Sequence, residues 1–167
     1  MMQDLHYLYK DREGNEIKVS LSFSVCEPVF RNVLPNTSIA SIDIERISEI
    51  SRISSKALFS IPGNILRLVE NDTSIIFYYL CDTEPLNCIG RKHVDMSPQE
   101  YRNRLFDAIY YRFKLSGMYV NRTIVLSDEL HGALFIHIIY HRDTPEDDIK
   151  RLENEILNTS EEILTRK

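Results

Sequence analysis

Residues 97–117 read SPQEYRNRLFDAIYYRFKLSG, and they carry the strongest helix signal in the chain. Ser97 can accept a hydrogen bond from a free backbone N–H at the helix start. Pro98 stands where its missing N–H costs nothing, and Glu100 completes a capping box. Gly117 can adopt the left-handed backbone that often ends a helix. These signals predict a helix over Pro98–Ser116.

Apolar residues recur in this helix at intervals of three or four, which is typical of one buried face. They are Tyr101, Leu105, Ala108, Ile109 and Phe113. The helix is therefore expected to pack on a sheet through this face.

Two other stretches predict that sheet. Residues from Glu16 to Val25 alternate between apolar and polar, which indicates a strand with one solvated face. Residues from Ser74 to Cys81 are apolar on both faces and predict a central, covered strand. Further strands are expected at 5–10, 39–47, 123–126 and 132–141. The isoleucine spacing after Ile39 would also suit a helical stripe, but serine and β-branched residues favour a strand that passes into a loop.

Two more helices complete the order of elements. Pro62-Gly63-Asn64 is expected to open a short helix over Ile65–Asn71. Thr144-Pro145 repeats the signal of a cap followed by proline before a final helix of about five turns. Its apolar stripe consists of Ile149, Leu152, Ile156 and Ile163. The order ββ(β)–α–β–α–ββ–α predicts an α+β protein: a two-layer sandwich with a mostly antiparallel sheet of five or six strands and about three helices on one face.

Length and composition favour a single folded domain over residues 1–167. The net charge of −5 disfavours a general nucleic-acid binder. Three cysteines and the absence of a basic, apolar leader suit a reduced, cytoplasmic protein. The sequence contains no stretch of about 18 consecutive apolar residues, so no membrane-spanning helix is expected. No nucleotide-binding or other cofactor motif occurs, so no cofactor is expected and an enzyme is disfavoured.

Cys81, Cys88 and His93 form one candidate metal or thiol site. Their spacing is not a standard zinc pattern, and no fourth ligand lies nearby in sequence. The plainer interpretation is a buried cysteine at a strand end and a free thiol in the following loop. A small metal- or thiol-dependent enzyme remains an alternative on these residues.

His137 and His141 lie four residues apart on the strand predicted over 132–141. Both point to one face, but the strand rise separates them by about 13 Å, which is too far to share one metal ion. They are expected to be polar residues on a half-exposed sheet face.

Positive charge gathers around the helix at 98–116. The candidate surface for an anionic partner consists of Arg91, Lys92, Arg102, Arg104 and Arg112. A basic helix with aromatic neighbours could grip a phosphate backbone or an acidic protein. Because the chain as a whole is acidic, nucleic acid is the disfavoured partner.

The stretches Asn64–Glu70, Phe77–Asp82 and Tyr101–Phe106 also resemble, in their order and pattern, a family of small uncharacterised proteins of gut Bacteroidetes. The resemblance covers roughly residues 60 to 141. That family has no assigned activity, so the resemblance implies only a bacterial, cytoplasmic, standalone domain.

The function expected from these observations is a non-enzymatic protein-interaction or self-associating module. Catalytic motifs are lacking, and tyrosine, which is frequent at interfaces, accounts for nine residues. The second face of the strand at 132–141 is half apolar and was expected to be a partner surface.

Overall fold

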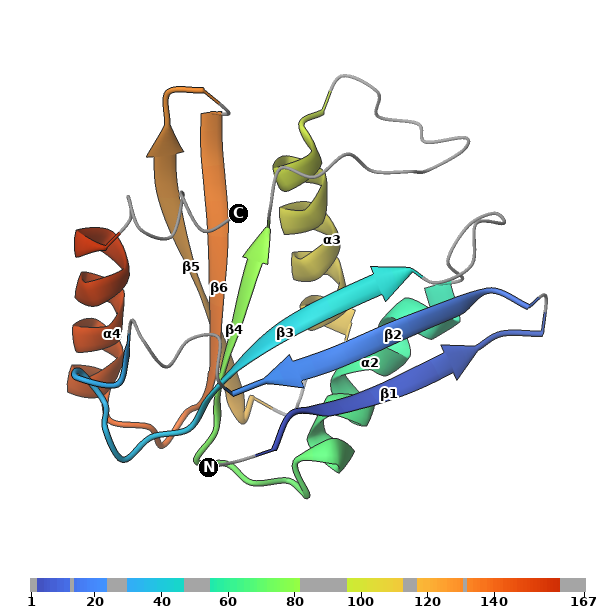
Figure 1. Ribbon diagram of the computed structural model, residues 1–167, viewed down its shortest axis with the longest axis horizontal. Coiled ribbons are helices and arrows are strands. Elements are labelled where there is room, and N and C mark those ends of the chain that lie inside the picture. Colours follow the sequence, from blue (N-terminus) through green and yellow to red (C-terminus); the bar gives the residue numbers. More distant parts are fainter. Residues whose placement is uncertain are drawn as a thin grey trace.

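Six strands form one mixed sheet in the computed structural model, in the order β1-β2-β3-β4-β6-β5 (Figure 1). They are β1 (Leu5–Lys10), β2 (Glu16–Ser22), β3 (Ile39–Arg46), β4 (Ile76–Cys81), β5 (Tyr119–Asp128) and β6 (Gly132–His141). All neighbours are antiparallel except β3 and β4. The structure describes residues 3–12, 14–23, 30–46, 55–81, 96–112, 117–130 and 132–159. The predicted α+β class and the mostly antiparallel sheet are confirmed.

In the part of the chain that the structure describes, the sheet is covered by three helices: α2 (Ser55–Leu68), α3 (Pro98–Arg112) and α4 (Glu146–Asn158). Helix α2 is the crossover between the parallel strands β3 and β4, and it packs with α3 on one face. Helix α4 packs on the opposite face, beside β5 and β6 (Figure 1). The prediction that all helices lie on one face is therefore wrong.

The physical reason is that the middle of the sheet is apolar on both sides. Strand β6 turns Leu134, Ile136 and Ile138 toward α4, whereas Ile139 belongs to the core on the other face. Strand β4 divides in the same way, with Phe77 on the face of α2. Two apolar faces each need a cover, so α4 has to pack opposite α2 and α3.

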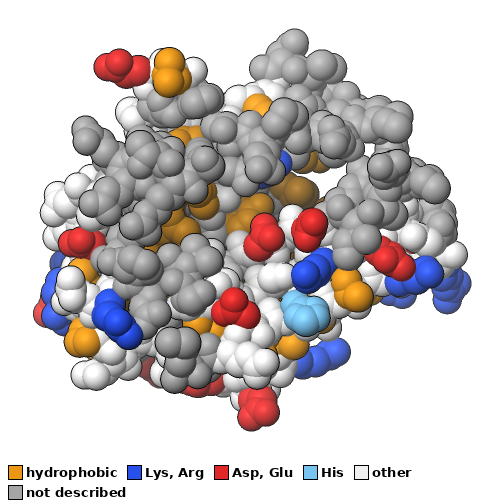
Figure 2. All heavy atoms as spheres, in the orientation of Figure 1, with side chains coloured by type: hydrophobic (Ala, Val, Ile, Leu, Met, Phe, Trp, Pro, Cys, Tyr) orange, Lys and Arg blue, Asp and Glu red, His pale blue; other side chains and the backbone are white. Residues whose placement is uncertain are grey.

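The outer part of the sheet keeps one wet face, as the alternation in β2 predicted. Ile17, Val19 and Leu21 are buried under α2, and the intervening residues are only half-buried. Figure 2 shows the wet side, where acidic and basic side chains are interspersed over the described surface. Residues 24 and 25, with which that predicted strand ended, lie outside the described residues.

Helix α2 begins earlier than the sequence indicated. It starts at Ser55 and contains Pro62 in its interior, although Pro62 was expected to open the helix. Ala57, Ile61 and Ile65 recur every four residues and are buried against the sheet. Their burial, worth roughly 1.5–3 kcal/mol for each large side chain, offsets the cost of about 3 kcal/mol for an interior proline. The helix also ends earlier than the expected Asn71, at Leu68, and the turn that follows has left-handed backbone at Glu70 and Asn71, where the Asn71 N–H donates to the Leu66 carbonyl at 2.8 Å.

Helix α3 begins as predicted but rotates its buried face. Ser97 Oγ accepts a hydrogen bond from the Glu100 N–H at 3.3 Å, which confirms the cap. Ala108 is exposed, however, while Gln99 is buried and Asn103 faces the sheet. The polar Asn103 is tolerated there because a histidine of β6 supplies it with a partner. Residues 113–116, including Phe113, lie outside the described residues.

The remaining elements differ from prediction mainly in length. Strand β5 pairs along all ten residues of β6, although only 123–126 was expected. The polar residues Asn121 and Arg122 interrupt the apolar–polar alternation of this strand, so the sequence pattern did not show its full length. Both polar side chains are tolerated there because each has a partner on a helix. Helix α4 has its acidic first turn but no side-chain cap, and Ile163 lies outside the described residues.

Candidate functional site

The predicted metal or thiol site is only partly described. Cys81 is fully buried at the end of β4. Cys88 and His93 lie outside the described residues. Among the residues that the structure describes, no group of three or more histidine, cysteine or acidic side chains could hold a metal ion.

The predicted basic surface is described for two of its five members. Arg104 is exposed and pairs with Glu100 of the same helix at 2.9 Å, and Arg102 is half-buried. Arg91, Lys92 and the side chain of Arg112 lie outside the described part of the chain. The pair between Arg104 and Glu100 offsets one of the positive charges.

His137 is the centre of a buried polar cluster that the sequence did not predict. Its ring is fully buried under α3, and Phe106 lies against it with the two ring centroids 4.5 Å apart. Asn121 Oδ1 lies 2.9 Å from its Nδ1, and Asn103 Oδ1 lies 2.7 Å from its Nε2. Asn121 Nδ2 also donates to the Asp107 carboxylate at 3.1 Å. Three elements, α3, β5 and β6, thus meet at one imidazole.

Amide oxygens face both nitrogens of the ring, and burial decides its protonation state. Because Asn121 donates its NH₂ group to Asp107, it presents its oxygen to His137 Nδ1, which therefore carries the proton. The structure places Asn103 Oδ1 at Nε2, and a neutral ring protonated at Nδ1 needs a donor there, which the Asn103 amide supplies when its NH₂ group takes the place of Oδ1. Burial lowers the pKa of His137 to about 4, which keeps the ring neutral at pH 7.

The cluster does not have the geometry of a catalytic triad. Thr123 Oγ1 and the Asp107 carboxylate lie 3.3 and 3.8 Å from the same nitrogen, Nδ1. A triad needs the nucleophile and the acid on opposite ring nitrogens. Here Nε2 faces Asn103 in the interior, so the arrangement ties α3 to the sheet.

His141 is also buried, so the expectation of a half-exposed pair is wrong for both histidines. Its Nδ1 accepts a hydrogen bond from the Asp143 N–H at 3.2 Å, in the turn that leads to α4. Helix α3 and Tyr119 cover the face that both histidines share. The second face of β6 is therefore not the open partner surface that was expected.

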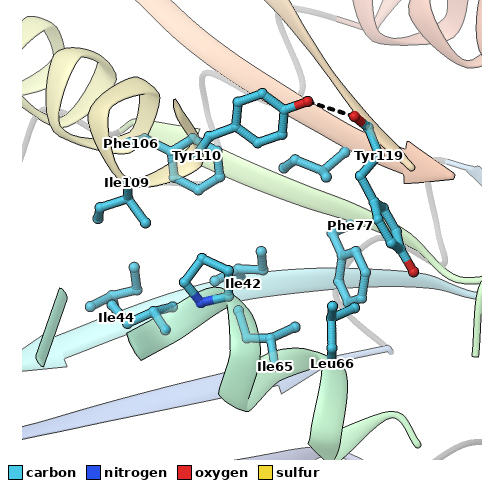
Figure 3. A pocket seen from close by; sticks show the side chains of 12 residues that line it. Ile42, Ile44, Ile65, Leu66, Phe77, Phe106, Ile109, Tyr110 and Tyr119 are labelled. Carbon is cyan, nitrogen blue, oxygen red and sulfur yellow. Dashed lines mark hydrogen bonds between the residues drawn. The ribbon is translucent and has the colours of Figure 1, made fainter. Parts of the chain in front are cut away.

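A small apolar cavity of about 60 Å³ separates α2 from α3 on this face of the sheet. Figure 3 shows Ile65 and Leu66 of α2 on one side, and Phe106 and Ile109 of α3 on the other. The Tyr110 hydroxyl donates to the Tyr119 carbonyl at 2.6 Å, so it is already engaged (Figure 3). The volume is far below the roughly 300–1,000 Å³ of small-molecule sites.

A larger groove runs between the edge strand β1 and α2. Its volume is about 730 Å³. Its wall on the sheet side is formed by Tyr7, Leu8 and Tyr9, and its wall on the helix side by Phe59, Ser60, Gly63, Asn64, Arg67 and Leu68. Side chains of a strand alternate between faces, so three consecutive residues can line one groove only along the edge of the strand. The groove therefore follows the free edge of the sheet.

The backbone of β1 supports this geometry. The Asp11 N–H donates to the Asn15 carbonyl at 2.9 Å, where the β1–β2 hairpin closes. Hydrogen-bonded and non-hydrogen-bonded residue pairs alternate along an antiparallel ladder. Counting from the bonded pair at Asp11, the backbone groups of Tyr9 and Tyr7 bond to β2, and those of Leu8 do not. The N–H and C=O of Leu8 consequently point out of the sheet, and its side chain is 61% exposed on the face away from the groove.

Polar groups in the groove include one buried hydroxyl and one cation. Burial raises the pKa of Tyr7 to about 12, and the neighbouring Asn64 side chain opposes that rise. Within the described residues, the Tyr7 hydroxyl makes no hydrogen bond of normal geometry. Arg67 is exposed, and its only recorded side-chain bond among the described residues is a long one of 3.5 Å to Asn64. The described residues that line the groove include no acidic one.

Sequence reasoning missed this groove because it depends on strand order. The pattern of residues 5–10 predicted β1 but could not place it at an edge or bring α2 beside it.

Comparisons with protein-family models, with curated proteins and with solved structures found no match. None of the described helices has both the length and the hydropathy needed to cross a bilayer.

Proposed function

We propose that this chain is a non-enzymatic protein-interaction module that binds an extended segment of a partner by adding it as a strand to β1. The observation that carries the proposal is the groove lined by three consecutive residues of an edge strand and by one helix. Strand addition needs an outward-facing backbone for affinity and a pocket for alternate side chains. Leu8 supplies the backbone groups, and the groove beside α2 supplies the pocket.

The size of the groove fits this role. A volume of about 730 Å³ accommodates two or three side chains of an extended segment, which repeat on one face about every 7 Å. Phe59 and Tyr9 offer apolar surface, while Ser60 and Asn64 bond to each other on the helix wall, with Asn64 Nδ2 3.4 Å from Ser60 Oγ. Edge strands without cover are templates for pairing, and β1 carries no proline and no bulge in its ladder with β2.

The cellular setting belongs to the same proposal: the cytoplasm of a bacterium. The low cysteine count supports a reducing compartment. Binding of an anion by the arginines of α3, and chemistry at Cys81, Cys88 and His93, stay as alternative predictions without a described site.

A backbone substitution tests strand addition directly. Leu8→Pro removes an N–H that points out of the sheet, so the β1–β2 ladder and the fold should persist. Leu8→Thr is the matched control, since it loses the apolar side chain but keeps the N–H. Peptides selected on the full-length protein from a phage-displayed random dodecapeptide library serve as probes. We expect them to bind the Leu8→Thr variant within about twofold of wild type and the Leu8→Pro variant at least about tenfold more weakly.

A second variant probes the pocket instead of the backbone. Gly63→Leu places a bulky side chain in the helix wall of the groove and improves the intrinsic helix propensity of α2. It should weaken the same peptides while leaving the thermal unfolding midpoint at or above that of wild type. Peptides that bind both the Leu8→Pro and the Gly63→Leu variant as well as wild type would refute the proposal. So would a concentration-dependent dimer in sedimentation that Leu8→Pro abolishes, because the occupant would then be a second copy.

A further inference from the structure

We infer that the segment bound at β1 carries an acidic side chain, aspartate or glutamate, that pairs with Arg67 across the groove. This inference rests on the proposed strand addition and specifies its partner. Arg67 is the one charged side chain among the described residues that line the groove. An acidic residue in the bound segment would find a cation there and no competing carboxylate.

The placement of Arg67 makes the pair attainable. Arg67 lies in the last turn of α2, where its bond to Asn64 at 3.5 Å is too long to hold it firmly. Among the described residues it forms no ion pair, in contrast to Arg104 and Arg122, which are both paired with glutamates. The planar guanidinium suits a two-point contact with a carboxylate, which gives geometric selectivity as well as charge.

The position of Arg67 favours a side-chain carboxylate of the bound segment over the carboxylate at its C-terminus. A strand added to β1 has its main chain in the plane of the sheet, beside the Leu8 backbone. Only its alternate side chains project onto the face that α2 covers. Arg67 is part of the helix wall on that face, so side chains of the added strand reach it and the chain terminus does not.

The test uses three synthetic nonapeptides of alternating threonine and valine with fluorescein joined to the N-terminus. The first has one central glutamate and an amidated C-terminus, and the second has glutamine in its place. The third has no glutamate but a free C-terminal carboxylate. Fluorescence anisotropy with the full-length protein should give binding of the glutamate peptide that is about threefold to fivefold tighter than that of the glutamine peptide, as for a partly exposed pair. Added salt should reduce the difference.

Arg67→Gln should abolish the preference for glutamate, and Lys150→Gln should preserve it. Lys150 is an exposed cation of α4, on the opposite side of the sheet, so its substitution removes the same charge without touching the groove. Leu8→Pro should weaken all three peptides. Equal binding of the glutamate and glutamine peptides, with both lost in the Leu8→Pro variant, would refute the acidic partner and leave strand addition standing.

Other results would overturn more. A preference for glutamate that survives Arg67→Gln would refute the role of Arg67. If the peptide with the free carboxylate gains the same advantage and loses it with Arg67→Gln, the chain terminus is the ligand and the side-chain assignment is wrong. If no peptide binds the wild type and Leu8→Pro changes nothing, the proposed function itself fails.

Discussion

His137 shows how far the environment of one residue can depart from its sequence context. Its neighbours on β6 are apolar, and its polar partners, Asn103 and Asn121, come from α3 and β5. The spacing from His141 correctly put both histidines on one face of a strand. Their burial could not be predicted from the sequence pattern. The helix that covers this face, α3, is distant from β6 in sequence and reaches it only in the folded protein.

The pH dependence of stability should report on this burial. The pKa of His137 falls from 6.5 to about 4 on folding, so the unfolded chain binds the proton first as the pH decreases. Stability is therefore fully present above about pH 6.5 and is lost as the pH falls toward 4. Between pH 8 and pH 5 the loss from this one group is roughly 2 kcal/mol, measured as the free energy of unfolding in urea.

Two variants separate His137 from the other titrating groups. His137→Gln should be less stable than wild type at pH 8, but its stability should decline less between pH 8 and pH 5. His6→Gln removes an exposed histidine on β1 and should keep the wild-type dependence on pH. Parallel pH profiles for wild type and the His137→Gln variant would show that the buried ring does not control this decline.

At the scale of the element, the two helices with similar start signals differ in the structure. Ser97 caps α3 through the Glu100 N–H. In α4, the cap position falls on Pro145, and no side chain caps the helix. Both starts contain a hydroxyl residue followed by proline, so the local pattern alone could not distinguish them.

Alanine substitution should separate these two helix starts. Ser97→Ala removes a hydrogen bond to a free N–H and should reduce the free energy of unfolding by about 1 kcal/mol. Thr144→Ala should change it by less than about 0.5 kcal/mol, because the hydroxyl caps no helical N–H in α4. Urea denaturation of both variants provides the comparison. Equal losses would mean that Thr144 also caps its helix.

Helix α2 shows that a local helix-start signal can be overridden by packing. Pro62-Gly63-Asn64 is a common way to begin a helix, yet here all three residues lie inside one. The buried stripe through Ala57, Ile61 and Ile65 overrides the local preference, since each turn gains apolar contact with the sheet. The interior position of Gly63 is also what brings a residue without a side chain to the wall of the β1 groove.

At the scale of the whole molecule, one sheet separates two apolar cores. Leu152 of α4 belongs to the core on one face and Ile61 of α2 to the core on the other. Leu152→Ala and Ile61→Ala should each lower the free energy of unfolding by about 2–5 kcal/mol. Leu157→Ala should cost far less, because Leu157 is 45% exposed. Both core variants should keep a single urea transition, since the two cores share the strands of one sheet.

Separate transitions in either core variant would contradict the single domain that the length and composition of the chain favour. A single transition that moves by similar amounts in both variants would support one cooperative unit. Circular dichroism and tyrosine fluorescence, recorded on the same samples, provide the two independent probes.

Capping, turn and pleat signals are local, since they act between residues a few positions apart. They determined which residues of β2 face the core, where α3 begins, that β4 is buried on both faces, and the α+β class. Strand order and helix placement depend on contacts between residues far apart in sequence. Only the tertiary structure therefore decided that α4 covers the opposite face, that His137 is enclosed, and that β1 lies at an edge with α2 beside it.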